Sequence, residues 1–183
     1  MNLKFLENLS VELETTNNGE STFIVLEAEK DYPQAQVLSS SQAGKLKSKS
    51  KILEWPGEYE IQGVMFKGTE AEDQLTIFST RIEEMMVVHL GKTKDISTDI
   101  VKQLGDIDVL ILPVHTDIRT AKAAKELSER IEARYIIPLG DMASDFIEMS
   151  GLHKSEIEGM AGKIKISKSG LPQDKTEVIN LSS

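Results

Sequence analysis

The chain contains no cysteine, and only 3 of its 183 residues are histidine. Without cysteine there are no disulfides, no thiolate metal ligands and no cysteine nucleophiles. Three histidines are also too few for the histidine-rich sites of many zinc enzymes, although a lone ion held by carboxylates stays open. We therefore expect no metal and no other cofactor.

Long apolar runs are missing as well. No stretch of about 18 apolar residues occurs, so no membrane span is predicted. The first eight residues include an acidic side chain where a signal peptide would continue its apolar region, and we expect a cytoplasmic location. Acidic residues outnumber basic ones by 30 to 21, and the net charge of -9 argues against general nucleic-acid binding.

The apolar pattern predicts a mixed α/β fold in one domain over residues 1–183. Short β-branched and apolar runs dominate the first half, where Asn-Asn-Gly at 17–19 marks a hairpin. A helical period and capping residues appear in the second half, between buried strands that should pair in parallel. We predict strands at 10–14, 22–26, 35–38, 64–67, 74–79, 85–90, 107–112, 135–138, 163–167 and 176–181, and helices at 97–105, 118–133 and 143–149.

Four sequence motifs occur in a distinctive order. Ser-Ser-Ser-Gln-Ala-Gly-Lys at 39–45 follows a buried strand, and Pro-Gly-Glu-Tyr-Glu-Ile occupies 56–61. His-Leu-Gly-Lys at 89–92 and Gly-Asp-Ile-Asp-Val-Leu at 105–110 come later. Together they resemble the small metal-dependent hydrolases of the metallo-β-lactamase superfamily. The resemblance implies a four-layer αββα sandwich, in a truncated or reduced version, and a metal-bound water that attacks the substrate.

At the metal-ligand positions, however, this chain departs from the family. The family's first motif reads Ser-His-x-His-x-Asp-His, its second histidine motif ends in aspartate, and its last histidine follows Ile-Pro. The resemblance places at the ligand positions Ser40, Gln42, Gly44, Lys45, Lys92 and Gly140. Hydroxyls and amides are weak zinc ligands, glycine has no side chain, and lysine is a cation at neutral pH. The sequence therefore predicts a member of the family that has lost its metal site and is not an enzyme.

We predict that the vacated site persists as a pocket. The resemblance directs Lys45 and Lys92 into it, where their charge would suit an anionic small molecule such as a phosphate or carboxylate. His115, with Asp117, follows a strand at the end where α/β sites gather, and Asp141 lies near the mouth, placed to pair with either lysine. The simpler interpretation of each lysine is a solvated loop residue, and that of His115 is a structural one.

Three functions stay open. The first, which we predict, is a binding or scaffolding module with a protein partner or in a homo-oligomer. The second is a hydrolase, either metal-dependent or using His115, Asp117 and Asp141 in new roles. The third makes the lysine-rich run at 45–51 a nucleic-acid contact, but the run has no interleaved aromatic side chains, and a solvated loop explains it more simply.

Overall fold

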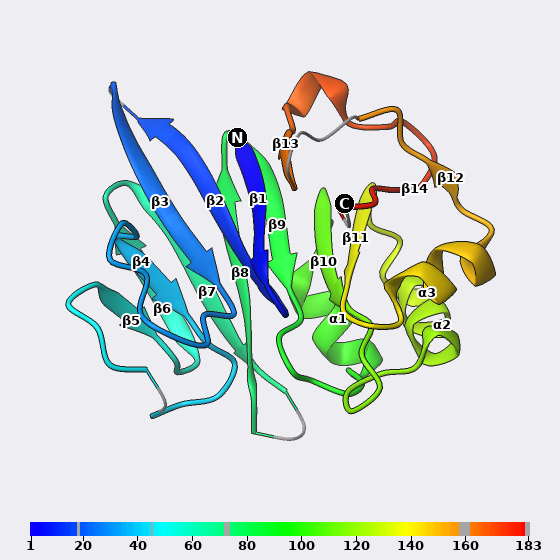
Figure 1. The fold of residues 1–183 in the computed structure, drawn as a ribbon, viewed down its shortest axis with the longest axis horizontal. Helices are drawn as coiled ribbons and strands as arrows, with labels where there is room; N and C mark the ends of the chain where they lie inside the picture. The colour runs from blue at the N-terminus through cyan, green and yellow to red at the C-terminus, as the bar shows by residue number, and fades with distance from the viewer. Residues whose placement is uncertain (18, 45, 72–73, 158–161, 182–183) are drawn as a thin grey trace.

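A computed structural model describes residues 1–183 except 18, 45, 72–73, 158–161 and 182–183. Two β-sheets lie face to face, and the helices gather on the side of one of them (Figure 1). Among the described residues, no helix is long and apolar enough to cross a membrane.

The first sheet has six strands. In order across the sheet they are β13 (Lys163–Lys165), β1 (Asn2–Glu7), β2 (Ser10–Asn17), β3 (Glu20–Leu26), β4 (Val37–Ser39) and β5 (Lys51–Leu53). The strands β1, β2 and β3 form an antiparallel meander, whereas β4 and β5 continue the sheet in parallel orientation. The loops after β3 and β4 therefore emerge at the same edge.

The second sheet has eight strands. In order they are β12 (His153–Lys154), β14 (Glu177–Val178), β11 (Tyr135–Leu139), β10 (Val109–Pro113), β9 (Met85–His89), β8 (Thr76–Ile82), β7 (Val64–Glu70) and β6 (Gly57–Ile61). The strands from β6 to β9 are antiparallel, and β9, β10 and β11 are parallel.

Three α-helices and one 3₁₀ turn complete the chain. They are α1 (Thr98–Leu104), α2 (Ala121–Ile131), α3 (Ala143–Ser150) and the turn Lys168–Gly170. The Ser97 and Thr120 hydroxyls cap α1 and α2 by accepting backbone N–H groups of the first turn. Gly105 ends α1, as its position after the last apolar residue predicts.

The strand β10 shows how the layers are filled. Val109 and Ile111 face the first sheet, whereas Leu110 and Leu112 face the helices, and all four are fully buried. On the helix side Phe146 of α3 is also fully buried. An all-apolar strand is what burial on both faces requires.

The sandwich predicted from the sequence is confirmed in its reduced form, with the α-helices of the described residues on one side only. Three helices cover the eight-stranded sheet. Within the described residues no helix covers the outer face of the six-stranded sheet, where loop residues such as Tyr32, Ala35 and Leu46 pack on Val25 and Leu38. The predicted parallel pairing of β10 with β11 through α2 is also confirmed.

Several predicted elements need correction. The sequence analysis missed β1, β5, β6 and β12, and it made the last strand longer than the two residues of β14. The predicted hairpin joins β2 to β3 with Asn17 opposite Glu20, although Asn18 lies outside the described residues. The apolar pattern does not predict those strands because they are short or because exposed residues interrupt the apolar alternation, as in β6.

Replacing Phe146 with alanine should lower the free energy of unfolding by about 3–5 kcal/mol, because the side chain is fully buried between α3 and the sheet. Chemical denaturation measures the change. The matched control on the same helix is Met149→Ala, whose side chain is 48% exposed and whose loss should cost less than about 0.5 kcal/mol. Equal losses for the two variants would contradict this packing.

Candidate functional site

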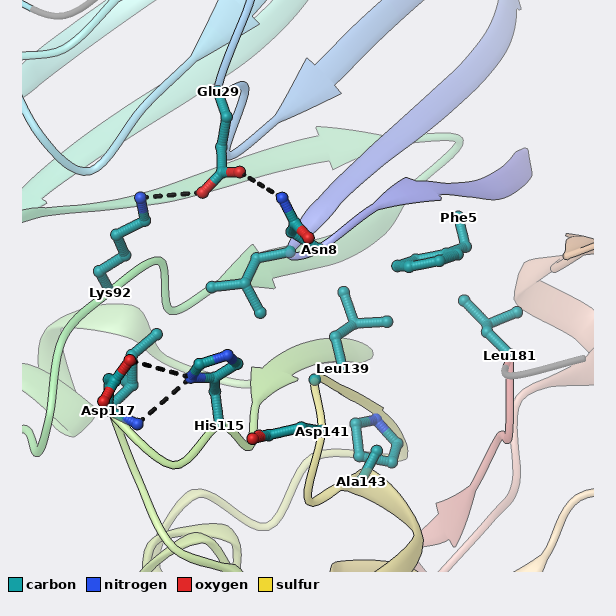
Figure 2. Close-up of a pocket in the computed structure, with 14 residues that line it drawn as sticks. Phe5, Asn8, Glu29, Lys92, His115, Asp117, Leu139, Asp141, Ala143 and Leu181 are labelled. Carbon is teal, nitrogen blue, oxygen red and sulfur yellow. Dashed lines mark hydrogen bonds and ion pairs between the residues drawn. The ribbon is translucent and has the colours of Figure 1, made fainter.

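A pocket of about 680 Å³ opens where the C-terminal ends of β9, β10 and β11 meet the β1–β2 turn and the end of β3 (Figure 2). Ligand sites in α/β sheets gather at the carboxyl ends of parallel strands, and this volume suits a small organic molecule. Its lining residues come from both sheets and are Phe5, Asn8, Leu9, Glu29, Lys92, His115, Asp117, Ile118, Pro138, Leu139, Gly140, Asp141, Ala143 and Leu181.

A hydrogen-bonded ion pair forms one side of the pocket. Lys92 Nζ lies 2.9 Å from Glu29 Oε1, and the Asn8 amide donates to Glu29 Oε2 at 2.7 Å (Figure 2). Both charged side chains are about one-third exposed, at 30% and 31%. Partial burial raises the pKa of Glu29, but the hydrogen bonds from Asn8 and Lys92 outweigh it and hold that pKa below its usual value. Lys92 therefore faces a carboxylate of its own chain.

The turn after β10 forms the opposite side. The backbone N–H of Asp117 donates to His115 Nδ1 at 3.2 Å, and the Asp117 carboxylate lies 4.0 Å from the same nitrogen (Figure 2). A neutral imidazole that accepts at Nδ1 carries its proton at Nε2. In this state the His115 ring can donate a hydrogen bond from Nε2 but cannot accept a proton there.

Asp141 lies on the same side of the pocket and is held there by hydrogen bonds from Thr116. Its Oδ1 accepts the Thr116 N–H at 3.0 Å, and its Oδ2 accepts the Thr116 hydroxyl at 2.7 Å. The hydrogen bond from the Thr116 hydroxyl, followed by that from its N–H, lowers the pKa of Asp141 against an opposing effect of desolvation. The carboxylate is ionised at neutral pH and fixed in direction.

Below this turn, Arg119 is almost completely buried and joins three segments. Its guanidinium donates to the backbone oxygens of Thr93 at 2.6 Å, Pro113 at 2.8 Å and Lys94 at 3.0 Å. Its backbone N–H also donates to His115 O at 2.8 Å. Arg119 therefore fixes the His115 turn relative to the loop that carries Lys92.

A buried histidine links the two sheets beneath the pocket. His89 Nδ1 accepts the Gly91 N–H at 2.9 Å, so its proton lies on Nε2, which donates to Leu9 O at 2.8 Å. Complete burial disfavours the charged ring and lowers its pKa to about 4. At neutral pH His89 is a neutral structural side chain.

A buried glutamate anchors the loop that aligns with the family's metal-binding motif. Glu27 accepts the Ser41 N–H at 2.9 Å and the Ser41 hydroxyl at 2.8 Å, and Ser41 Oγ accepts the Lys92 N–H at 3.1 Å. A Cβ at Gly91 would lie only 2.5 Å from the Ser41 Cβ, so this contact requires glycine. Burial raises the pKa of Glu27, although the Ser41 hydrogen bonds oppose the shift.

The structure brings only some of the sequence-predicted residues together. Lys92, His115, Gly140 and Asp141 line the pocket, whereas Ser40 and Gln42 are not among its lining residues. The Ser40 hydroxyl instead donates to the backbone oxygen of Gln42 within the loop, at 3.2 Å. Lys45 lies outside the described residues.

The expected pairing of Asp141 with Lys92 also needs correction, whereas its pairing with Lys45 lies outside the described residues. Asp141 is held by Thr116, and Lys92 pairs with Glu29. Both contacts join loops that follow different strands: Thr116 and Asp141 follow β10 and β11, and Lys92 and Glu29 follow β9 and β3. The family motif does not include Glu29, so the sequence analysis had no reason to place it there.

The donor set does not fit the two-metal site that the family implies. Within the described residues, no three or more aspartate, glutamate or histidine side chains converge as metal ligands. At Gly140 a Cβ would lie 2.5 Å from Val114 O, and the φ of +117° suits glycine. This backbone therefore has no room for the family's last histidine, and Lys92 presents an ammonium where a carboxylate would bind metal.

Comparison with known families decides the relationship. The family model of the beta-lactamase superfamily domain matches residues 34–140, which is more than half of the chain. The chain belongs to this superfamily. No curated protein matches it at a significant level.

Solved structures share the superfamily fold. A proposed Zn-dependent hydrolase of the metallo-β-lactamase superfamily from Thermotoga maritima is 24% identical, with 98% of each chain covered and a TM-score of 0.76. The metallo-β-lactamase fold protein YhfI from Bacillus subtilis is 8% identical, over 93% of this chain and 87% of that one, with a TM-score of 0.58. The metallo hydrolase Igni18 from Ignicoccus hospitalis is 11% identical, over 75% and 81%, with a TM-score of 0.56. These likenesses support the fold alone.

Sequence reasoning missed Asn8, Glu27, Glu29 and Arg119. Only Glu27 had a local indication, because a charged residue directly after the apolar run of β3 needs a polar partner if it is buried. The other three acquire their roles from contacts between distant segments.

Changing Glu27 to glutamine should alter how stability depends on pH. The folded-state pKa of Glu27 is raised. The contribution of Glu27 to the free energy of unfolding is therefore greatest below the ordinary pKa of 4.5, and it is lost as the pH rises toward the folded-state pKa. Glutamine binds no proton, but its amide can still accept from Ser41 N–H and donate to Ser41 Oγ. The stability of E27Q relative to wild type should therefore rise in urea titrations as the pH increases above about 4.5.

The matched control is Glu29→Gln. The pKa of Glu29 is lowered, so its contribution is present at neutral pH and is lost in acid. Relative to wild type, E29Q should therefore lose stability as the pH rises from acid to about 4.5, with little further change above that value. Parallel curves for the two variants would contradict the assigned states.

Replacing Arg119 with lysine should lower the free energy of unfolding by about 1–3 kcal/mol, because one ammonium cannot reach all three carbonyl oxygens. Arg130→Lys is the control, since that half-exposed side chain contacts Asp95 and Ile96 near the surface. Thermal and chemical denaturation should give a clearly smaller loss for R130K. A neutral R119K would show that the carbonyl cluster does not need the guanidinium.

Proposed function

We propose that this protein is a binding module on a hydrolase fold, which holds a small molecule in the pocket and does not hydrolyse it. The observation that supports this most is the pair formed by Lys92 and Glu29. At the position where the family's aspartate would hold metal, the chain places a cation and neutralises it internally. The pocket persists around that pair with a volume suited to a ligand.

The proposal does not depend on the charge of the ligand. The expected anionic ligand rested on Lys45 and Lys92, of which the first lies outside the described residues. The Glu29 carboxylate, 2.9 Å from Lys92 Nζ, offsets the charge of Lys92 and would repel a second anion there, which weakens the case for an anion. The anionic ligand stays a prediction.

The rival reading, a hydrolase with relocated residues, has less support. As a general base His115 would need a free ring nitrogen facing the substrate, but Nδ1 accepts the Asp117 N–H and Nε2 then carries the proton. Asp141 uses both oxygens on Thr116. The nearby serines are engaged as well, Ser41 with Glu27 and Ser40 within its own loop.

The remaining predictions concern partners. A protein partner or a homo-oligomer stays a prediction. For nucleic acid, the side chains of Lys47, Lys49 and Lys51 are exposed on the loop before and at the start of β5, which agrees with a solvated loop. Alternating exposed lysines at an edge strand also discourage strand pairing between molecules.

Metal content and hydrolysis test the proposal together. After dialysis against zinc and removal of excess, elemental mass spectrometry should find far less than one zinc per chain. Turnover of phosphodiester, phosphomonoester, ester and β-lactam substrates should be no faster with wild type than with His115→Ala. Both expectations follow from the missing ligand set and the unavailable base.

Each contrary result identifies a different alternative. Roughly one or two tightly held zinc ions with chelator-sensitive turnover would establish a metal hydrolase. Chelator-resistant turnover that disappears in H115A would establish the relocated site. Either outcome overturns the proposal.

A further inference from the structure

We infer that the pocket selects a small amphipathic amine, a ligand with a cationic ammonium group and an apolar body. This inference rests on the proposed binding function and names its ligand class. It follows from how charge and apolar surface are divided between the walls of the pocket.

The described residues give the pocket a negative charge. Among them, the charged side chains of the lining are one lysine, Lys92, and three carboxylates, Glu29, Asp117 and Asp141. Lys92 and Glu29 neutralise each other at 2.9 Å. The two aspartates remain, and both lie on the opposite wall, beside His115 (Figure 2).

The contacts of these aspartates leave their charge in place. Asp141 accepts from the hydroxyl and backbone N–H of Thr116, which are neutral donors. Asp117 faces His115 Nδ1 at 4.0 Å, and that nitrogen accepts the Asp117 backbone N–H. Because the Asp117 side chain is 89% exposed, it sits at the mouth, where it attracts cations but is screened by salt.

An apolar wall lies beside the charged one. Phe5, Leu139 and Leu181 project toward the same space from β1, the end of β11 and the C-terminal segment (Figure 2). Buried apolar contact with several carbon atoms stabilises binding by about 25 cal/mol per Å², with no requirement for a charge. A ligand that places an alkyl or aryl group here can bring its ammonium to Asp117 and Asp141.

Anionic ligands are disfavoured by the charge of the pocket. A carboxylate or phosphate of similar size would approach two aspartates, and its natural partner Lys92 is already occupied. An uncharged ligand would gain the apolar contacts alone. The expected order of affinity is therefore amine, then alcohol, then carboxylate.

Three probes of equal chain length test this order: hexylamine, hexanol and hexanoate, each titrated into ¹⁵N-labelled protein at low salt and neutral pH. Hexylamine should bind about threefold to tenfold more tightly than hexanoate. Amide shifts should concentrate at residues 115–118 and 139–143, which border the pocket. Added salt should reduce the preference, because both aspartates face solvent.

Two variants separate charge from shape. The double change Asp117→Asn with Asp141→Asn should lower the affinity for hexylamine by about threefold or more. The affinity for hexanol should stay the same, which would show that the pocket is intact. The matched control is the double change Asp99→Asn with Asp106→Asn, two exposed acids outside the pocket, which should leave all three affinities unchanged. Glu29→Gln removes the carboxylate that pairs with Lys92 and should raise the affinity for hexanoate.

The outcomes distinguish this inference from the proposed function. Tighter binding of hexanoate or hexanol than of hexylamine, or no binding of any probe, overturns the amine class. A preference for hexylamine that survives D117N/D141N overturns the assigned charges. The zinc and turnover measurements decide the proposed function separately, whatever the probes show.

Discussion

A chain of buried hydrogen bonds at the edge of the two sheets holds the rest of the pocket in place. His89 and Lys92, at the end of β9, bond two different parts of the molecule, and between them the Gly91 N–H donates to His89. His89 reaches the β1–β2 turn at Leu9, and Lys92 reaches Ser41, which is itself fixed by Glu27. Segments from both sheets therefore meet in one network that needs no external ligand.

This network explains how the walls stay ordered while the donor set of the family is missing. In proteins, buried polar groups must find partners, and a fully satisfied network fixes one arrangement of the surrounding chain. Here Ser41 bonds Glu27 and Lys92 N–H, while the Lys92 side chain is left to meet Glu29. The loop and the pocket wall are thus coupled through adjacent atoms of the same lysine.

The sequence predicted the layers well because apolar periodicity records burial directly. The four-residue apolar centre of β10 and the capped helix α1 were readable without tertiary information. The strand β6 was not, because Pro56 and Gly57 suggest a turn and its glutamates are exposed. Such a strand is specified by pairing with β7, and pairing leaves little trace in a single segment.

The pocket was predictable in position but not in charge. Lys92 and Gly140 were found through the family motif, and His115 and Asp141 through their places after buried strands. Glu29 lies in the local run Glu-Ala-Glu-Lys, which looks like any solvated charged stretch. This run follows β3 in one sheet and meets the lysine after β9 only because the two sheets stack, so the charge of the pocket depends on tertiary structure.

The backbone at Gly140 has a consequence for evolution and for design. Because the Val114 carbonyl fills the space of a side chain, a histidine cannot be introduced at this position on the present backbone. The ends of β10 and β11 would first have to separate, and further ligand residues would have to be introduced around them. A path from this chain to a metal enzyme therefore begins with a backbone rearrangement that confers no activity by itself, and single substitutions sampled one at a time would not find it.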